Sequence, residues 1–169
     1  KNIYESNLGI YSVYNLFLGQ DYVSRSSKNI LFFGRISRYK GIDILLKAMK
    51  SIHQVQPNLK LIIAGNGDYY FDKTEFENLN YIEFRNRYIP NSELVSLIKD
   101  SLFVVCPYID ATQSGVIMTS YAFCKPVIAS NIGGLSEVVV DKVTGYLIES
   151  NNIVELQNSI IKLVSNKKL

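Results

Sequence analysis

Histidine, cysteine and tryptophan are scarce or missing in this sequence. Its 169 residues contain one histidine, two cysteines and no tryptophan. Cys106 and Cys124 lie in apolar surroundings without the spacing of metal ligands, and His53 has no second histidine to pair with. These shortages exclude a zinc site built from cysteine and histidine. Two thiols without a disulfide pattern are typical of a reducing compartment, so we expect a cytoplasmic protein.

Long apolar runs and dense basic clusters are also missing. No uninterrupted apolar segment approaches the roughly 20 residues of a membrane-spanning helix, and the N-terminus lacks a signal-peptide pattern. The net charge of +3 permits an anionic ligand but does not favour nucleic acid as a partner. The length suits one domain with a sizeable core. Because the first residue is Lys1 rather than methionine, we expect a fragment of a longer protein.

From Asn29 onward, short apolar runs alternate with helical patterns. The runs ILFFG, LKLIIAG, YIEF, LFVVCPY, KPVIAS and TGYLIE predict six strands. Helices are predicted over residues 41–55, 91–101, 115–123, 135–140 and 153–166, with a weak helix up to about Glu77 and with Asn91 or Ser92 as a cap. Short connections favour right-handed crossovers, so we predict an α/β, Rossmann-like parallel sheet with helices on both faces.

The first 28 residues differ from the rest of the chain. They are aromatic and rich in turn-forming residues, and they show no clean periodicity. We interpret residues 1–28 as a linker or packing segment from a preceding domain, and residues 29–169 as the domain itself.

In a parallel sheet, the loops that follow the strands meet at one edge, where ligands bind. The loop after the first predicted strand, GRISRYKG, places Arg35 and Lys40 five positions apart at the start of a helix. A guanidinium and an ammonium at a helix start form a phosphate-binding arrangement. The loop lacks the Gly-Lys-Ser/Thr order of a Walker loop. The alternative, two surface charges, is disfavoured because the helix dipole repels cations at this end.

The loop after the fourth predicted strand contains the sequence TQSG. Gly115 allows a close backbone approach, and the free N–H groups of Gly115, Val116 and Ile117 would point to the same edge. A diphosphate accepts such hydrogen bonds and is stabilised by the helix dipole. The hydroxyls of Thr112 and Ser114 either cap the helix or donate to the ligand, and both alternatives stay open.

Other loops give weaker signals. Tyr88 or Ile89 would lie against a base or ring, although Ile89 precedes a proline and equally suits packing. Gly133 and Gly134 are consistent with a second backbone approach to a ligand, whereas the AGNG sequence is mainly a turn signal.

Five segments resemble, in order and spacing, the C-terminal domain of family 4 glycosyltransferases. They are GRISRYKGIDILLKAM, LKLIIAGNGD, NSELVSLIKDSLFVVCPY, KPVIASNIGGLSEVV and VTGYLIE, and the resemblance extends over about residues 29–169. Members of this family are retaining, metal-independent enzymes of the two-domain GT-B fold that use nucleotide-activated sugars. The resemblance implies a nucleotide-diphosphate sugar as donor substrate, and no cofactor.

The resemblance also implies roles for individual residues. Arg35 and Lys40 would hold the donor's diphosphate and form the catalytic set. Gly115 and Val116 would give backbone N–H groups to the phosphates, and the Tyr88–Ile89 turn would lie near the base. The expected donor-binding residues are Gly34, Tyr88, Ile89, Thr112, Ser114, Gly115, Val116, Thr119 and Ser120.

The sequence departs from the family at one motif. The family carries two glutamates eight residues apart, and the second binds the donor ribose. Counting back from the Lys-Pro pair places that second position at Thr119, and counting on from the glycine of TQSG places it at Ser120. Eight residues earlier lie Ala111 and Thr112, with Asp110 adjacent. A hydroxyl makes a weaker bond than a carboxylate, about 1 against 1.5–3 kcal/mol, so we expect altered donor affinity or identity.

We therefore predict the donor-binding half of a bacterial glycosyltransferase of surface polysaccharide biosynthesis. The acceptor-binding domain is expected outside this chain, so the 169 residues alone should bind a nucleotide sugar weakly and turn nothing over. Peripheral membrane association of the full enzyme stays open. One alternative is a non-catalytic binding module derived from such a half. Another, a nicotinamide-dependent oxidoreductase, requires a Gly-x-Gly-x-x-Gly turn that GRISRYKG lacks.

Overall fold

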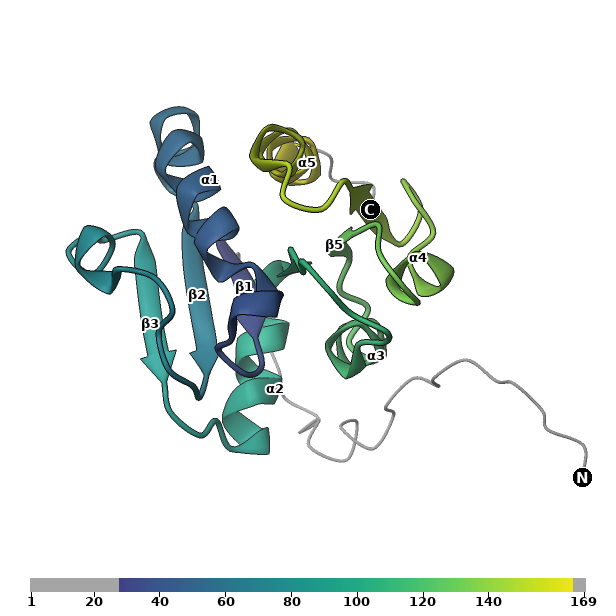
Figure 1. Cartoon of the computed structure of the whole chain (residues 1–169), viewed down its shortest axis with the longest axis horizontal. Coiled ribbons are helices and arrows are strands. Elements are labelled where there is room, and N and C mark those ends of the chain that lie inside the picture. The colour runs from purple at the N-terminus through teal and green to yellow at the C-terminus, as the bar shows by residue number, and fades with distance from the viewer. Residues whose placement is uncertain (1–27, 166–169) are drawn as a thin grey trace, which may run out of the picture.

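A computed structural model describes residues 28–165, and these form a six-stranded parallel sheet in the order β3-β2-β1-β4-β5-β6 (Figure 1). The strands are β1 Asn29–Phe33, β2 Lys60–Gly65, β3 Ile82–Asn86, β4 Ser101–Cys106, β5 Val127–Ser130 and β6 Gly145–Ile148. The helices are α1 Ile42–Val55, α2 Asn91–Lys99, α3 Gly115–Ala122, α4 Leu135–Val138 and α5 Ile153–Ser165, with 3-10 turns η2 Arg38–Lys40 and η3 Lys73–Glu75. The predicted Rossmann-like fold is confirmed. Apart from Lys28, the predicted linker segment lies outside the described residues.

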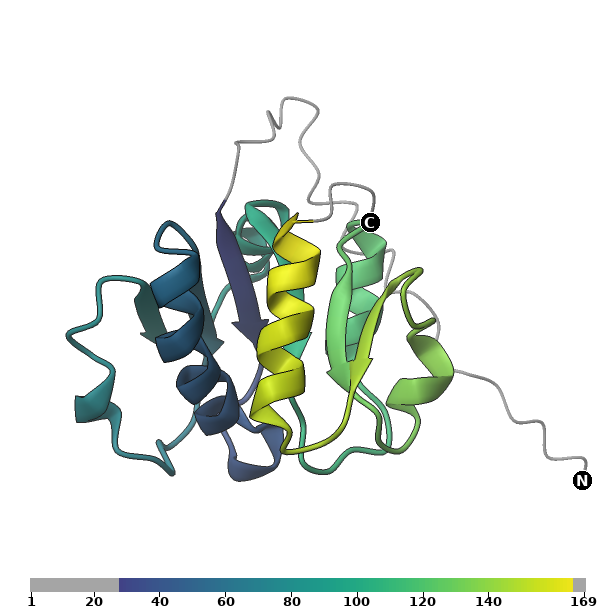
Figure 2. The ribbon, with the colours of Figure 1, turned by 90° about the horizontal axis from the view of Figure 1, so that it is seen from above.

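The sheet is covered on both faces, and this explains its uninterrupted apolar strands. In β1, residues Ile30, Leu31 and Phe32 are fully buried, because side chains on both faces of the strand meet helices. Helices α1 and α5 lie side by side on one face, and α2 and α3 cover the other (Figures 1 and 2). Within the described part of the chain, no helix is both long and apolar enough to span a bilayer.

The strand order places a topological switch point between β1 and β4. The chain winds from β1 toward β3 on one side and from β4 toward β6 on the other. Loops 34–41 and 107–114 therefore leave neighbouring strands at the same edge. They touch directly, since the amide of Ile109 donates to the carbonyl of Tyr39 at 2.7 Å. Gly41, at φ 64°, approaches the Pro107 carbonyl so closely that a Cβ would lie 1.9 Å from its oxygen.

Two local predictions were wrong. The weak helix expected up to about Glu77 is only the short turn η3, because the Asp72 carboxylate accepts from the amide of Thr74 and closes a local turn. Helix α2 has Pro90 at its N-cap position, so neither of the two expected residues caps it. A proline there has a fixed φ that suits the entry to a helix without supplying a side-chain acceptor.

Candidate functional site

A cleft of about 870 Å³ opens at the carboxyl edge of β1, β2 and β3. It lies between residues 33–38 on one side and residues 87–89 with Leu94 on the other, with residues 64–68 and Tyr70 completing it. This volume falls in the range of roughly 300–1,000 Å³ found for small-molecule and cofactor sites. The cleft therefore has room for a ligand of nucleotide size.

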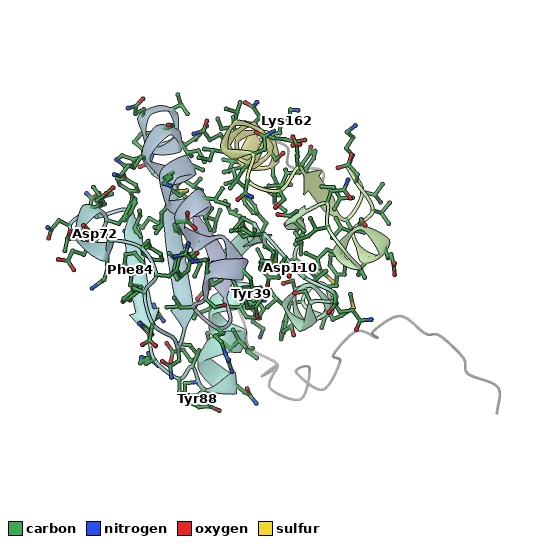
Figure 3. The ribbon with its side chains drawn as sticks, viewed as in Figure 1. Tyr39, Asp72, Phe84, Tyr88, Asp110 and Lys162 are labelled. Atoms are coloured by element: carbon green, nitrogen blue, oxygen red, sulfur yellow. The ribbon has the colours of Figure 1, made fainter. Side chains whose placement is uncertain are left out.

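Four of the residues predicted from the sequence line this cleft: Gly34, Arg35, Tyr88 and Ile89. Arg35 is exposed and makes no ion pair with any described residue, so its charge is available. Tyr88 is 75% exposed at the far end of the cleft (Figure 3). Ile89 is half-buried and contacts the core, so it both packs and lines the cleft.

The start of α3 lies next to the loop that carries Arg35. A Cβ built on Gly34 would lie 3.6 Å from Cγ2 of Val116. No backbone carbonyl among residues 28–165 accepts from the amides of Gly115 or Val116. The amide of Ile117, which we expected to be free, donates to the Ser114 carbonyl at 3.2 Å, so that expectation was wrong. Two amides and one guanidinium thus belong to neighbouring turns at the switch point.

The start of α1, by contrast, is already occupied. The Tyr70 hydroxyl accepts from the amide of Ile42 at 2.7 Å and donates to Oδ1 of Asp43 at 3.0 Å. Burial raises the pKa of Tyr70, so the phenol stays protonated. The sequence argument had used the helix start beside Lys40 as part of a phosphate site. Because a phenol and a carboxylate fill that position, the amides at the start of α1 are not available to an anion.

Lys40 is turned inward rather than toward the cleft. It is buried, and its Nζ lies 3.7 Å from the ring centroid of Tyr108 and 5.1 Å from that of Tyr39. It makes no ion pair with the described residues. Burial lowers the pKa of Lys40, and this outweighs the opposing effect of Cys106. Its ammonium is stabilised by aromatic faces, which attract cations electrostatically.

Ser114 neither caps α3 nor faces the cleft. It occupies the N-cap position, but its side chain makes no cap bond and lies 3.3 Å from the hydroxyl of Tyr108. Thr112 is exposed near the same turn. Sequence reasoning missed Tyr108, although its position directly after β4 at the switch point was a usable signal.

Thr119 and Ser120 are buried within α3. Their hydroxyls donate to the carbonyls of Gly115 at 2.8 Å and Val116 at 2.7 Å, so both side chains bond back into their own helix. Neither lines the cleft. Asp110, the carboxylate nearest the missing family motif, is exposed in loop 107–114 and lies close to Tyr39 (Figure 3).

The other candidate loops make contacts within the protein. A Cβ on Gly133 would lie 1.9 Å from the Ala111 carbonyl oxygen, and one on Gly134 would lie 2.4 Å from that of Thr112. These glycines therefore allow loop 131–134 to approach the loop after β4, and the expected second approach to a ligand stays a prediction. This contact fixes the turn that precedes α3.

Arg85 and Arg87 form ion pairs with glutamates of the same domain. Both guanidinium groups contact the Glu93 carboxylate, at 2.9 and 2.7 Å, and Arg85 also contacts Glu83. The two arginines lower the pKa of Glu93, with hydrogen bonding from Arg87 as the largest cause. These ion pairs connect the end of β3 to the first turn of α2, and Arg87 also lines the cleft.

The family model for glycosyl transferases group 1 matches residues 21–169. The chain belongs to this family. Among curated members, an uncharacterized glycosyltransferase of Methanocaldococcus jannaschii is 37% identical over 142 residues, which cover 82% of this chain and 39% of that protein. The D-inositol 3-phosphate glycosyltransferase of Corynebacterium glutamicum is 31% identical over 138 residues, covering 75% of this chain and 32% of the relative. The chain thus spans about two-fifths or less of these glycosyltransferases.

Solved structures share the fold of this chain. Sucrose-phosphate synthase of Thermosynechococcus elongatus aligns with a TM-score of 0.72 and 25% identity, over 92% of this chain and 39% of that one. Anabaena HepE, solved in complex with UDP-glucose, aligns with a TM-score of 0.70 and 23% identity, over 82% of this chain and 39% of that one. The described residues therefore form a Rossmann-like α/β domain whose structural neighbours are GT-B glycosyltransferases.

Proposed function

We propose that this domain binds a nucleotide-diphosphate sugar as the donor for retaining, metal-independent glycosyl transfer in surface polysaccharide biosynthesis. One observation carries the donor assignment: the exposed Arg35 and the uncommitted amides of Gly115 and Val116 lie on touching turns beside a nucleotide-sized cleft. The resemblance to family 4 enzymes supports the stereochemistry and the pathway.

The electrostatics suit the chemistry of such a donor. When the anomeric carbon–oxygen bond breaks, the departing nucleotide diphosphate gains negative charge. The Arg35 guanidinium and the two α3 amides are positive groups beside the cleft that would stabilise this charge. The Lys40 ammonium would contribute from its buried position on the Tyr108 ring. The nucleoside part would occupy the cleft toward Tyr88 and Ile89. The solved complex of HepE with UDP-glucose supports a donor of this class.

The ribose contact differs from the family pattern. Thr119 and Ser120 stand where the ribose-binding glutamate is expected, but their hydroxyl protons are already used within α3. The ribose therefore loses a charge-assisted bond, which contributes roughly 1.5–3 kcal/mol where it forms. We expect donor affinity below that of relatives that carry the glutamate.

Arg35→Ala tests the assignment. It should weaken the binding of a nucleoside diphosphate at least about tenfold, because a charge-assisted bond to phosphate is lost. Since Arg35 is exposed and makes no ion pair with the described residues, the free energy of unfolding should change little. The measurement is calorimetric titration with UDP, GDP and ADP, alongside urea denaturation.

Lys60→Ala is the matched control. Lys60 is an exposed cation at the opposite end of β2, so its removal changes the net charge equally without touching the cleft. Equal affinity losses in the two variants would show that Arg35 acts only through the net charge of the protein. Unchanged affinity in Arg35→Ala would remove this residue from the site.

A non-catalytic binding module is the second candidate. The self-bonded hydroxyls of Thr119 and Ser120, in place of a carboxylate, favour it. A thermal-shift screen of uridine, guanosine and adenosine diphosphates and their sugars separates the two. Stabilisation by one nucleotide class supports donor binding, and no shift with any of them supports the inert module.

A further inference from the structure

One buried tyrosine contacts two parts of the predicted diphosphate site. Tyr108 follows β4 at the switch point and is fully buried. Its ring lies 3.7 Å from Nζ of Lys40, and its hydroxyl lies 3.3 Å from that of Ser114. Tyr108 does not line the cleft, so these contacts serve the groups around the ligand rather than the ligand itself.

The contact with Ser114 has a consequence for α3. The backbone of Ser114 has an extended conformation, φ −139° and ψ 109°, as N-cap residues do. A serine at this position ordinarily accepts from the second or third helical amide, here Val116 or Ile117. The Ile117 amide is already bonded to the Ser114 carbonyl. The Val116 amide is therefore the one that the serine hydroxyl would take, and it is left free instead.

We propose that Tyr108 is a positioning residue, which holds the Ser114 hydroxyl away from α3 so that the Val116 amide stays available to an anion. The proposal rests on the proposed diphosphate site. A capping serine and a phosphate oxygen compete for the same amide hydrogen. By bonding to Ser114, the Tyr108 hydroxyl settles this competition in favour of the ligand and leaves the helix without its own cap.

Tyr108→Phe isolates this role, because it removes the hydroxyl and keeps the ring under Lys40. The released serine should turn and cap α3. We expect the affinity for inorganic pyrophosphate and for UDP to fall about fivefold, the effect of one neutral hydrogen bond. The amide of Val116 should exchange with solvent more slowly, since it gains an acceptor. The unfolding midpoint should stay within about 4 °C of the wild type, because the gained cap offsets part of what the hydroxyl contributed through Ser114 and Cys106.

A second substitution provides a rescue test. Ser114→Ala in the Tyr108→Phe background removes the competing hydroxyl, so pyrophosphate affinity should return to within about twofold of the wild type. A merely structural role for Tyr108 predicts that the double variant binds no better than Tyr108→Phe. Tyr121→Phe is the matched control, because it also breaks a tyrosine-to-hydroxyl contact, with Thr144 at 2.8 Å, in the last turns of α3.

The outcomes separate this proposal from the proposed function. If the wild-type chain binds pyrophosphate and UDP but Tyr108→Phe binds them equally well, the positioning role is overturned and the site stands. If the wild type binds neither, the donor site is overturned. Amide exchange at Val116 needs no ligand and tests the role of Ser114 in either case. If Tyr108→Phe does not fold, Ser114→Ala alone decides: an exchange rate at Val116 within about twofold of the wild type supports an uncapped helix, and faster exchange contradicts it.

Discussion

At the scale of single residues, burial gives Lys40 a different chemistry from that of a lysine in solvent. Its ammonium lies on the Tyr108 ring, and desolvation lowers its pKa below the ordinary value of 10.5. The sequence correctly indicated a cation in this loop, because spacing and composition are local properties. The direction of its side chain depends on Tyr108, which lies 68 positions further along the chain. No local pattern carries that information.

In the proposed site, the lowered pKa of Lys40 should make diphosphate binding sensitive to pH. The cationic form of Lys40 attracts phosphate, so affinity should fall as the pH rises through its lowered pKa, before a solvated lysine would lose its charge. A bound diphosphate favours the charged form, so binding in this range should take up a proton. Titration calorimetry from neutral to alkaline pH, in buffers of different ionisation enthalpy, measures both effects.

Lys40→Arg should bind with an affinity that stays constant to higher pH, because a guanidinium remains charged. Lys47→Arg is the control, since Lys47 is an exposed lysine on α1 outside the cleft. Identical pH profiles for the wild type and Lys40→Arg would show that Lys40 takes no part in binding.

At the scale of the elements, α1 begins without a cap of its own and receives one from another loop. Gly41 occupies its N-cap position and supplies no side chain. The Tyr70 hydroxyl, from the segment after β2, accepts from Ile42 and bonds Asp43. The 3.6-residue periodicity was sufficient to predict the extent of α1, because it depends only on residues inside the helix. The cap comes from a loop brought close by the sheet order, so the sequence alone did not reveal it.

Tyr70→Phe should lower the free energy of unfolding by about 1–2 kcal/mol, because the start of α1 loses its acceptor and Asp43 loses a donor. Urea denaturation measures the change. Tyr69→Phe is the control: Tyr69 packs on Phe71 and Phe84, and its hydroxyl bonds no described residue. Equal midpoints for the two variants would mean that solvent replaces the phenol at this helix start without loss.

The glycines at the loop edge likewise separate what the sequence indicates from what the tertiary structure decides. Gly65, at φ 150°, packs so closely on loop 34–41 that a Cβ would lie 1.9 Å from the Gly34 carbonyl oxygen. Gly133 makes an equivalent approach to Ala111. A glycine in the sequence indicates that the backbone closely approaches either a ligand or a neighbouring loop. The strand order decides which of the two it is.

At the scale of the whole molecule, the chain corresponds to only part of the glycosyltransferases that it resembles. It spans 39% of the Methanocaldococcus jannaschii relative and 39% of the sucrose-phosphate synthase chain. A glycosyl transfer needs an acceptor placed against the donor's anomeric carbon. The described residues form one Rossmann-like sheet with a cleft of about 870 Å³ at its carboxyl edge. The donor side of the reaction is therefore the part that this chain can be expected to supply.

We expect the isolated 169 residues to bind a nucleotide sugar without transferring it. The experiment incubates the chain with the nucleotide sugar that stabilises it most and with a panel of acceptors, and follows release of the nucleoside diphosphate. Steady acceptor glycosylation would contradict this expectation. Slow hydrolysis of the sugar nucleotide alone would not, because water can replace an acceptor in an open site.

The sequence by itself determined the order of the strands and main helices along the chain, the parallel sheet and the edge at which the loops after the strands gather. These follow from local periodicity and from the handedness of short crossovers, both of which act over neighbouring residues. Only the tertiary structure decided that Lys40 rests on Tyr108, that Tyr70 caps α1, that Ser114 is held away from α3 and that Arg85 and Arg87 are paired. The contacts of Lys40 with Tyr108 and of Tyr70 with α1 join loops that follow different strands, so they depend on which loops the order β3-β2-β1-β4-β5-β6 makes neighbours. The contacts of Ser114 and of Glu93 join residues close in sequence, and they depend on how the chain turns after β4 and after β3.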